Sequence, residues 1–231
     1  LKVKNYDFFS EIKEHIKKIK PKLVAIANPN QPIEIMLNLN QIGEICKLAK
    51  KYNSLVIIDE AYYHFNNVTA KNLINKFENL IVVRTFSKAF GLAGMRIGYT
   101  MSNKKIIGYM LSIKPIYEIN AVNIKLVRFF LKNLNIMKNY VAEVAKSRIL
   151  FKNSLKKHNI EVVGKYSNTV LFKLKDNNQV KKIIKYLYKK KFIIRPMTID
   201  GDNSYIRATI GGVKIMKNFL KQFDIGMKKF K

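Results

Sequence analysis

The stretch TFSKAFGLAGMRIGY, residues 85–99, surrounds one lysine with residue types that suit phosphate chemistry. Lys88 follows Ser87, precedes a glycine-rich turn and stands eight residues before Arg96. A deprotonated lysine amine is a nucleophile that forms Schiff bases with carbonyl groups. A hydroxyl, an arginine and glycines that let the backbone approach closely would suit a phosphate beside that amine. A lone lysine in a turn is usually only solvated, so this interpretation needs support from other motifs.

A second motif, VIIDEAYYHF at residues 56–65, places an acid at the end of a continuous apolar run. A carboxylate in such a place is costly unless a partner takes its charge. The protonated pyridine nitrogen of pyridoxal phosphate (PLP) is such a partner for Asp59. Tyr62 could bond a phenolic oxygen. The alternative is a helix cap by Asp59 and core packing by Tyr62. We interpret the nearby His64 as structural, and we predict no metal site.

Two weaker motifs lie elsewhere in the chain. ANPNQP, residues 27–32, offers amides that could line a site, although Asn and Pro are also ordinary turn residues. YIRATIGG, residues 205–212, places Arg207 in an otherwise apolar strand. A buried guanidinium requires a carboxylate, which either the protein or a substrate could supply.

Together, in this order and spacing, the motifs resemble fold-type I PLP-dependent aminotransferases of class I and II, nearest to the histidinol-phosphate aminotransferases. The resemblance extends over essentially the whole chain and includes SIKPIYEIN, residues 112–120. It implies an enzyme that moves an amino group from an amino acid, or a phosphorylated amino-acid-like donor, to PLP and then to a 2-oxo acid. A homodimer is implied as well.

The resemblance also implies cofactor-binding roles. Lys88 would bind PLP covalently and move the substrate proton, Asp59 would keep the pyridine nitrogen protonated, and Tyr62 would bond the ring oxygen O3′. Three further residues would bind the cofactor phosphate: Thr85, Ser87 and Arg96.

The remaining implied roles concern the substrate and the ring oxygen. Arg207 would bind the substrate carboxylate, and Arg195, in FIIRP, would meet a phosphorylated or acidic part of the substrate. Asn30 or Gln31, or neither, would bond O3′, because the family usually has Asn where this chain has Gln31. The family also usually has Pro-Thr-Gly where this chain has PIE, residues 32–34. Glu34 in place of Gly restricts the loop and puts a standard substrate in question.

Apolar runs at residues 22–27, 54–59, 80–85 and 96–101 predict strands, and the period of 39–53 predicts a helix. Such alternation is typical of a sheet covered on both faces, with function at the carboxyl ends of its strands.

A helical pattern at 119–158 precedes a mixed region. Strands are predicted there at 168–174, 191–196 and 204–211, and helices at 179–190 and 213–223. The expected fold is α/β. Residues 1–148 would form the three-layer α/β/α PLP-binding large domain, without its N-terminal part, and residues 149–231 a small C-terminal α+β domain.

The net charge of +29 raises the question of nucleic-acid binding. The lysines are spread over every segment and far outnumber the arginines that usually recognise bases and phosphates. We therefore predict no specific nucleic-acid partner. No apolar run is long enough for a membrane span, so we predict no membrane partner. The single cysteine, Cys46, fits a reducing compartment, and we predict core packing for it and a cytoplasmic location for the protein.

The chain begins at Leu1, and the family has roughly a hundred residues before the corresponding point. We therefore expect a poor enzyme in isolation and an active complete protein. Two alternatives remain open. Threonine-phosphate decarboxylase-like enzymes share these motifs, and a decayed aminotransferase scaffold could act as a basic binding module.

Overall fold

The computed structural model describes residues 7–230, which form two compact units. The larger unit contains residues 7–31 and 35–137. The smaller unit contains residues 32–34 and 138–230. The chain therefore enters the smaller unit briefly at 32–34 and returns before its final crossing after residue 137. Each unit has its own sheet, and each is described below by itself.

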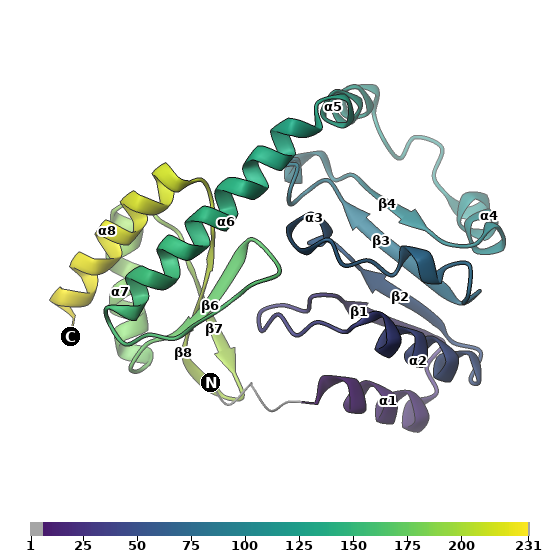
Figure 1. Cartoon of the computed structure of the whole chain (residues 1–231), viewed down its shortest axis with the longest axis horizontal. Helices are drawn as coiled ribbons and strands as arrows, with labels where there is room; N and C mark the ends of the chain where they lie inside the picture. Colours follow the sequence, from purple (N-terminus) through teal and green to yellow (C-terminus); the bar gives the residue numbers. More distant parts are fainter. Residues whose placement is uncertain (1–6, 231) are drawn as a thin grey trace. The chain divides into compact units, whose positions relative to one another are not determined.

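The larger unit is built on a four-stranded sheet in the order β1-β2-β3-β4. Strands β1, β2 and β3 are parallel, and β4 pairs with β3 in the antiparallel sense (Figure 1). The four strands predicted for this region are confirmed, with small shifts at their ends. They are β1 (Leu23–Ala27), β2 (Leu55–Asp59), β3 (Leu80–Thr85) and β4 (Gly98–Met101).

Helices, several with capped N-termini, accompany this sheet. They are α1 (Phe8–Ile19), α2 (Leu39–Lys50), α3 (Tyr63–Asn66), α4 (Lys104–Ile113) and α5 (Ala121–Lys132), with short 3₁₀ turns η2 (Lys71–Leu73) and η3 (Ala93–Met95). Asn38 and Gln41 cap α2 reciprocally, which satisfies two of the amides that a helix start leaves unpaired. The predicted helix at 39–53 is confirmed.

Apolar faces of α1 and α2 pack with the parallel strands to form the core. Ile16, Ile42 and Ile58 belong to this cluster. Cys46 lies there as well, with no solvent exposure, and burial raises the pKa of its thiol to about 12. The cysteine is therefore a packing residue.

The loop after β1 is closed by two asparagine side chains. Asn28 brackets Leu37, accepting from its N–H at 2.8 Å and donating to its carbonyl at 3.1 Å. Asn30 accepts from the N–H of Ile35 at 3.1 Å, and its own N–H donates to the Ile35 carbonyl at 3.0 Å. The side chains thus replace strand pairing, which is why these residue types occur here.

The smaller unit has an antiparallel sheet in the order β5-β6-β8-β7. Its strands are β5 (Val162–Val163), β6 (Thr169–Lys173), β7 (Arg195–Ile199) and β8 (Asp202–Thr209), and its helices are the greater part of α6 (Leu134–Lys156), α7 (Asn177–Lys189) and α8 (Val213–Lys229). Four phenylalanine rings pack together in its core, at Phe151, Phe172, Phe219 and Phe223.

Most of the elements predicted for this unit are confirmed, but one strand is displaced. The pattern at 191–196 predicted a strand, whereas β7 begins only at Arg195. The chain leaves α7 through Lys191 in the left-handed conformation, with φ +66°, and reaches pairing register with β8 four residues later. The boundary predicted between residues 148 and 149 falls inside α6.

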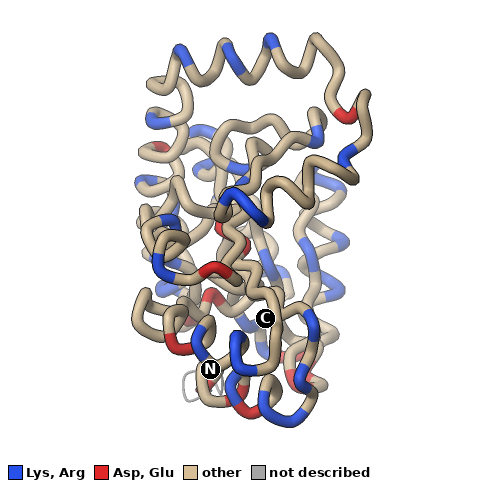
Figure 2. Tube along the Cα trace, turned by 90° about the vertical axis from the view of Figure 1, so that its right-hand side faces the viewer, with Lys and Arg blue, Asp and Glu red and all other residues tan. Residues whose placement is uncertain are grey.

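Lysine and arginine occur along the whole trace rather than on one element (Figure 2). None of the helices between residues 7 and 230 is long and apolar enough to cross a bilayer.

Candidate active site

The lysine singled out by the sequence lies just beyond the carboxyl end of β3, in a turn held by hydroxyl groups. The Thr85 hydroxyl is 2.9 Å from that of Ser87 and 3.2 Å from the Ile97 carbonyl, and it accepts from the Ser87 N–H at 3.0 Å. Lys88 follows at once. Its Nζ lies 5.4 Å from the centre of the Tyr62 ring. Within residues 7–230 no carboxylate pairs with this amine.

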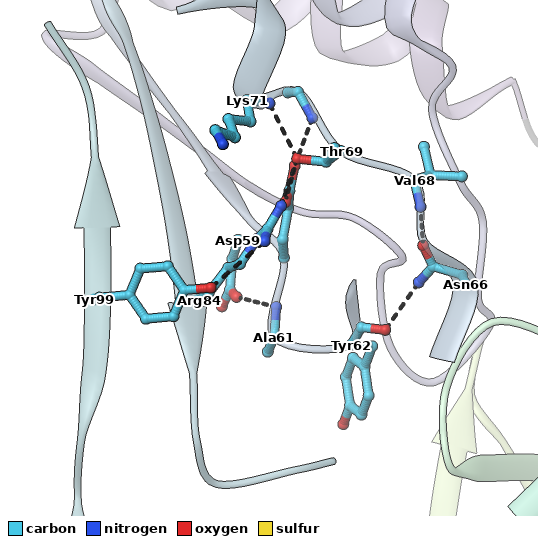
Figure 3. A network of polar contacts seen from close by, with 11 residues as sticks. Asp59, Ala61, Tyr62, Asn66, Val68, Thr69, Lys71, Arg84 and Tyr99 are labelled. Carbon is cyan, nitrogen blue, oxygen red and sulfur yellow. Dashed lines mark hydrogen bonds and ion pairs between the residues drawn. The ribbon is translucent and has the colours of Figure 1, made fainter. Parts of the chain in front are cut away.

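Asp59, at the carboxyl end of β2, starts a tight turn in which its Oδ1 accepts from the Ala61 N–H at 2.9 Å (Figure 3). The expectation of a buried charge at Asp59 is wrong, because this side chain is exposed. The buried carboxylate is its neighbour Glu60, only 2% exposed. Strand alternation turns successive side chains to opposite faces, and this accounts for the difference.

Glu60 forms a buried ion pair with Arg84, which lies one residue before Thr85. Glu60 Oε2 is 2.9 Å from Arg84 Nε, and Oε1 accepts from the Ala70 N–H at 2.6 Å. The Thr69 hydroxyl donates to Glu60 Oε2 at 2.8 Å and accepts from Arg84 Nη2 at 2.7 Å. Each oxygen of the carboxylate therefore has a donor.

The rest of the Arg84 guanidinium is enclosed by tyrosines. Its Cζ lies 3.4 Å from the centre of the Tyr63 ring. Its Nη1 is 3.4 Å from the Tyr99 hydroxyl (Figure 3). Burial alone lowers the pKa of Arg84, but the hydrogen bonds to Tyr99 and Glu60 outweigh it, so the net pKa lies above the ordinary value. The sequence analysis missed this pair. The sequence offered one sign of this pair: Arg84 stands at the end of an apolar run, LIVVRT, where a charged side chain requires a partner.

Arg96 ends η3 in the left-handed conformation, with φ +53°, and its Nη1 donates to the Ala93 carbonyl at 3.1 Å. The guanidinium is exposed. Two residues later, a Cβ on Gly98 would lie 2.6 Å from the Arg84 carbonyl oxygen. Only glycine permits this approach of β4 to β3.

The two ends of the Asn30 side-chain amide differ in their hydrogen bonding. The side-chain oxygen of Asn30 is bonded to Ile35, and its Nδ2 has no partner among residues 7–230. An unpaired amide donor would suit a phenolate oxygen.

His64 packs by its edge on Phe90, with ring centres 5.1 Å apart. Burial, followed by the positive charge of Arg84, lowers its pKa. In the described part of the chain, no three His, Cys, Asp or Glu side chains cluster as metal ligands.

In the smaller unit, Arg195 and Arg207 occupy directly opposite positions on β7 and β8. Both line a pocket of about 260 Å³, together with Ile193, Pro196 and Thr209. Neither arginine has an acidic partner among the described residues, so the internal salt bridge considered for Arg207 is not found there. Two adjacent guanidinium groups without an acid are a ready site for an anion.

Glu34, the departure noted in the sequence, is also placed in the smaller unit. It is buried and takes the left-handed conformation, with φ +61°. Its Oε2 accepts from the N–H groups of Lys165 and Tyr166, each at 2.6 Å, and its Oε1 accepts from the Ser167 hydroxyl. Glu34 thus adopts a conformation that glycine favours and adds three hydrogen bonds.

In the larger unit the predicted cofactor residues lie at the carboxyl ends of parallel strands or in the loops that follow them. β2 and β3 are neighbours in the sheet, and Asp59 is paired in register with Val83, two residues before Thr85. The available groups fit PLP: an exposed carboxylate, an unpaired amine beside a tyrosine ring, a pair of hydroxyls and an exposed guanidinium. Among these groups, Lys88 contacts the Tyr62 ring and Thr85 contacts Ser87.

Comparison with known proteins gives matches over almost the whole chain. The family model described as aminotransferase class I and II matches residues 7–222. A histidinol-phosphate aminotransferase of Thermoanaerobacter pseudethanolicus is 36% identical over 89% of this chain. That match covers 57% of the relative, so the chain spans less than three fifths of its length.

Solved structures agree in fold. The histidinol-phosphate aminotransferase of Sinorhizobium meliloti, in complex with pyridoxal 5′-phosphate, superposes with a TM-score of 0.87 at 21% identity. The superposition covers 96% of the present chain and 62% of the Sinorhizobium meliloti chain. The L-threonine-O-3-phosphate decarboxylase of Porphyromonas gingivalis superposes with a TM-score of 0.75 at 22% identity, covering 90% of this chain and 65% of that chain. The expected α/β fold is therefore confirmed, with only part of the neighbours' chains represented.

Proposed function

We propose, since the chain belongs to the class I and II aminotransferases, that its protein uses PLP to move an amino group from an amino-acid-like donor to a 2-oxo acid. The observation that carries the proposal is the environment of Lys88. Its amine has no acidic partner in the described part of the chain and lies beside Tyr62, just after the hydroxyls of Thr85 and Ser87. A solvated surface lysine would have no need of these neighbours.

The cofactor, when bound, supplies an electron sink for negative charge at the substrate α-carbon. The residues of the larger unit would hold it and act on it. Lys88 would bind it covalently through Nζ, and would later take the proton from the substrate α-carbon and return it. Asp59 would hold a proton on the pyridine nitrogen. Tyr62 and the Asn30 Nδ2 would donate to the ring oxygen.

The phosphate of the cofactor would be bound by the turn that precedes Lys88. Thr85 and Ser87 would offer hydroxyl donors, and Arg96 a guanidinium. These groups would fix the cofactor at its far end, so that the orientation of the ring relative to Lys88 does not depend on the lysine alone.

The substrate class follows from Arg195 and Arg207. A phosphate monoester carries up to two negative charges, and two adjacent guanidiniums complement it better than one. The same pair would bind the carboxylate of a 2-oxo acid in the second half of the reaction. We therefore propose a histidinol-phosphate-like donor, which carries a phosphate ester, and a 2-oxo acid acceptor.

A phosphorylated amino acid that loses carbon dioxide would satisfy the same two arginines. Decarboxylation of the threonine-phosphate type is therefore the alternative within PLP chemistry. Product analysis separates the two reactions. Transamination gives an oxo product, whereas decarboxylation gives carbon dioxide. A decayed, inactive scaffold is disfavoured because Lys88, Asp59, Tyr62, Arg96 and Arg207 are all present.

The chain by itself leaves apolar surface uncovered. Strand β1 pairs only with β2 in the described structure, and a groove of about 300 Å³ runs beside it, lined by Ile12, Ile19 and Leu23 among others. At the end of α4 and in the segment that leads to α5, Ile113, Ile116 and Tyr117 are almost fully exposed. We propose that full activity requires further residues of the complete protein, which would act as a cytoplasmic homodimer.

The test is the visible absorption spectrum of the chain with PLP, followed by borohydride reduction and peptide mapping. We expect a band from a lysine-bound cofactor and a reduced adduct on Lys88. Adducts scattered over many surface lysines would contradict the proposal for this chain. The same measurement on an N-terminally extended protein would then separate an incomplete site from an absent one.

A further inference from the structure

One buried ion pair adjoins both cofactor-binding turns of the larger unit. Glu60 immediately follows Asp59, and Arg84 immediately precedes Thr85. The two residues bridge β2 and β3, and the Glu60 N–H also donates to the Val83 carbonyl at 2.8 Å. The pair therefore connects the turn expected at the pyridine nitrogen to the turn expected at the cofactor phosphate.

The pair is deeply enclosed. The Glu60 side chain is 1% exposed and the Arg84 side chain 9%. Such pairs are poor sources of stability, because the cost of removing two charges from water offsets most of their attraction. Apolar residues of similar volume would often serve the fold as well. In this pair the guanidinium also contacts Thr69 and two tyrosines, so most of its donors have partners.

We propose that Glu60 and Arg84 are positioning residues for the cofactor, an inference that rests on the proposed function. Their hydrogen bonds fix the backbone on either side of the site, so that Asp59, Tyr62 and Thr85 are held before any ligand arrives. Stacking of Arg84 on Tyr63 restrains the residue next to Tyr62. Neither Glu60 nor Arg84 would touch the cofactor.

Two backbone amides report on these turns directly. The Ala61 N–H donates to Asp59, and the Ser87 N–H donates to Thr85. If the ion pair positions the turns, then loss of the pair will speed hydrogen exchange at both amides. It will also weaken PLP binding. Exchange does not depend on the cofactor, so the positioning and the proposed function are tested separately.

The main variant is Glu60→Gln with Arg84→Met. Glutamine retains an acceptor for the Ala70 N–H and a donor for Thr69, and methionine fills the space against Tyr63. The bridge between the strands is lost, but no charge remains buried without a partner. The matched control is Lys50→Met with Glu78→Gln, which removes an ion pair of 2.8 Å from the surface of the same unit.

We expect the main variant to remain folded, with amide exchange at Ala61 and Ser87 about tenfold faster and PLP affinity reduced about tenfold or more. The control variant should match the unaltered chain in both measurements. Unchanged exchange at both amides and unchanged PLP affinity in a folded main variant would overturn the inference. The pair would then be structural only.

Should the main variant fail to fold, Arg84→Lys serves instead. Lysine retains the positive charge opposite Glu60 but lacks the planar fork that reaches Thr69 and Tyr99 as well. The same two amides and the same PLP titration decide the question. If the unaltered chain shows no lysine-bound cofactor, the proposed function of the isolated chain fails, while faster exchange in the variants would still support the positioning role.

Discussion

The two units carry the side chains proposed for function in different ways. In the larger unit, the proposed cofactor residues lie at the ends of three strands and in the turns that follow them, far apart in the sequence. In the smaller unit, Arg195 and Arg207 lie within the strands themselves, opposite each other in one antiparallel pair. Backbone pairing alone brings these two arginines together.

This difference predicts which substitutions would disturb each of the two proposed sets of binding residues. A site made of turns requires support at every turn, and we propose that the buried Glu60–Arg84 pair supplies it. A site made of paired strands requires only the correct register, because a slip of one residue would turn a side chain to the other face. Substitutions in the larger unit should therefore affect cofactor binding, and substitutions in the smaller unit should affect anion binding.

The largest expected effect is from Lys88→Met, which should abolish the covalent PLP adduct. Methionine has similar length but no amine, so nothing remains to form the bond. Arg207→Met should leave the adduct intact. Absorption spectra and borohydride labelling of the two variants provide the measurement. Loss of the adduct in the arginine variant would show that cofactor chemistry is not confined to the larger unit.

Removal of either arginine should weaken anion binding with little effect on the fold. For Arg207→Met or Arg195→Met, we expect binding of inorganic phosphate to weaken by about tenfold to a hundredfold, the loss typical of a charge-assisted pair. Arg207→Lys should recover only part of it, because lysine lacks the planar fork. Calorimetric titration measures each affinity. If all three variants bound phosphate as tightly as the unaltered chain, this pocket would not be the anion site that we propose.

Glu34→Gln should destabilise the smaller unit by about 1–3 kcal/mol, because an amide cannot accept from all three donors that converge on the carboxylate. Denaturant unfolding measures the change. Glu14→Gln, an exposed position on α1, removes the same charge and should cost almost nothing. A loss no greater than that of the control would mean that the three donors find other acceptors.

The smallest effect concerns Asp202 in the smaller unit. Its hydrogen bond from Lys173, together with those from Ser204, lowers its pKa from 3.8 to about 2. A carboxyl with a depressed pKa stabilises the fold above its unfolded pKa, and this contribution is lost as the pH falls from about 4 to about 2. The stability difference between the unaltered chain and Lys173→Met should therefore vanish over that window. A difference that persists at pH 2 would contradict this assignment.

Sequence periodicity was sufficient to predict the four strands of the larger unit, because short continuous apolar runs between helical patterns are typical of strands that are buried on both faces. The strand at 191–196 was displaced because an apolar run does not reveal where pairing register begins. Helix α1 was not predicted, although Phe9, Ile12, Ile16 and Ile19 recur at the spacing of an amphipathic helix.

The residues proposed to bind cofactor and substrate were easier to single out than the buried pair behind them. Motifs pointed to Lys88, Asp59 and Arg207, whose roles stay predictions. Glu60 and Arg84 were not, because each is separately an ordinary charged residue, and only the sheet brings them together. Glu34 was noticed as a departure, but its conformation and its three donors depend on a turn more than 130 residues away in the sequence.

The close approach of β4 to β3 at Gly98 limits which residues evolution can place at this position. Any side chain there would collide with the backbone of Arg84, the residue that forms the buried ion pair with Glu60. In a saturation mutagenesis library, position 98 should therefore be intolerant of every replacement, alanine included. Such variants would be lost through misfolding, so the position would look catalytic in a selection for growth although its glycine has no functional group.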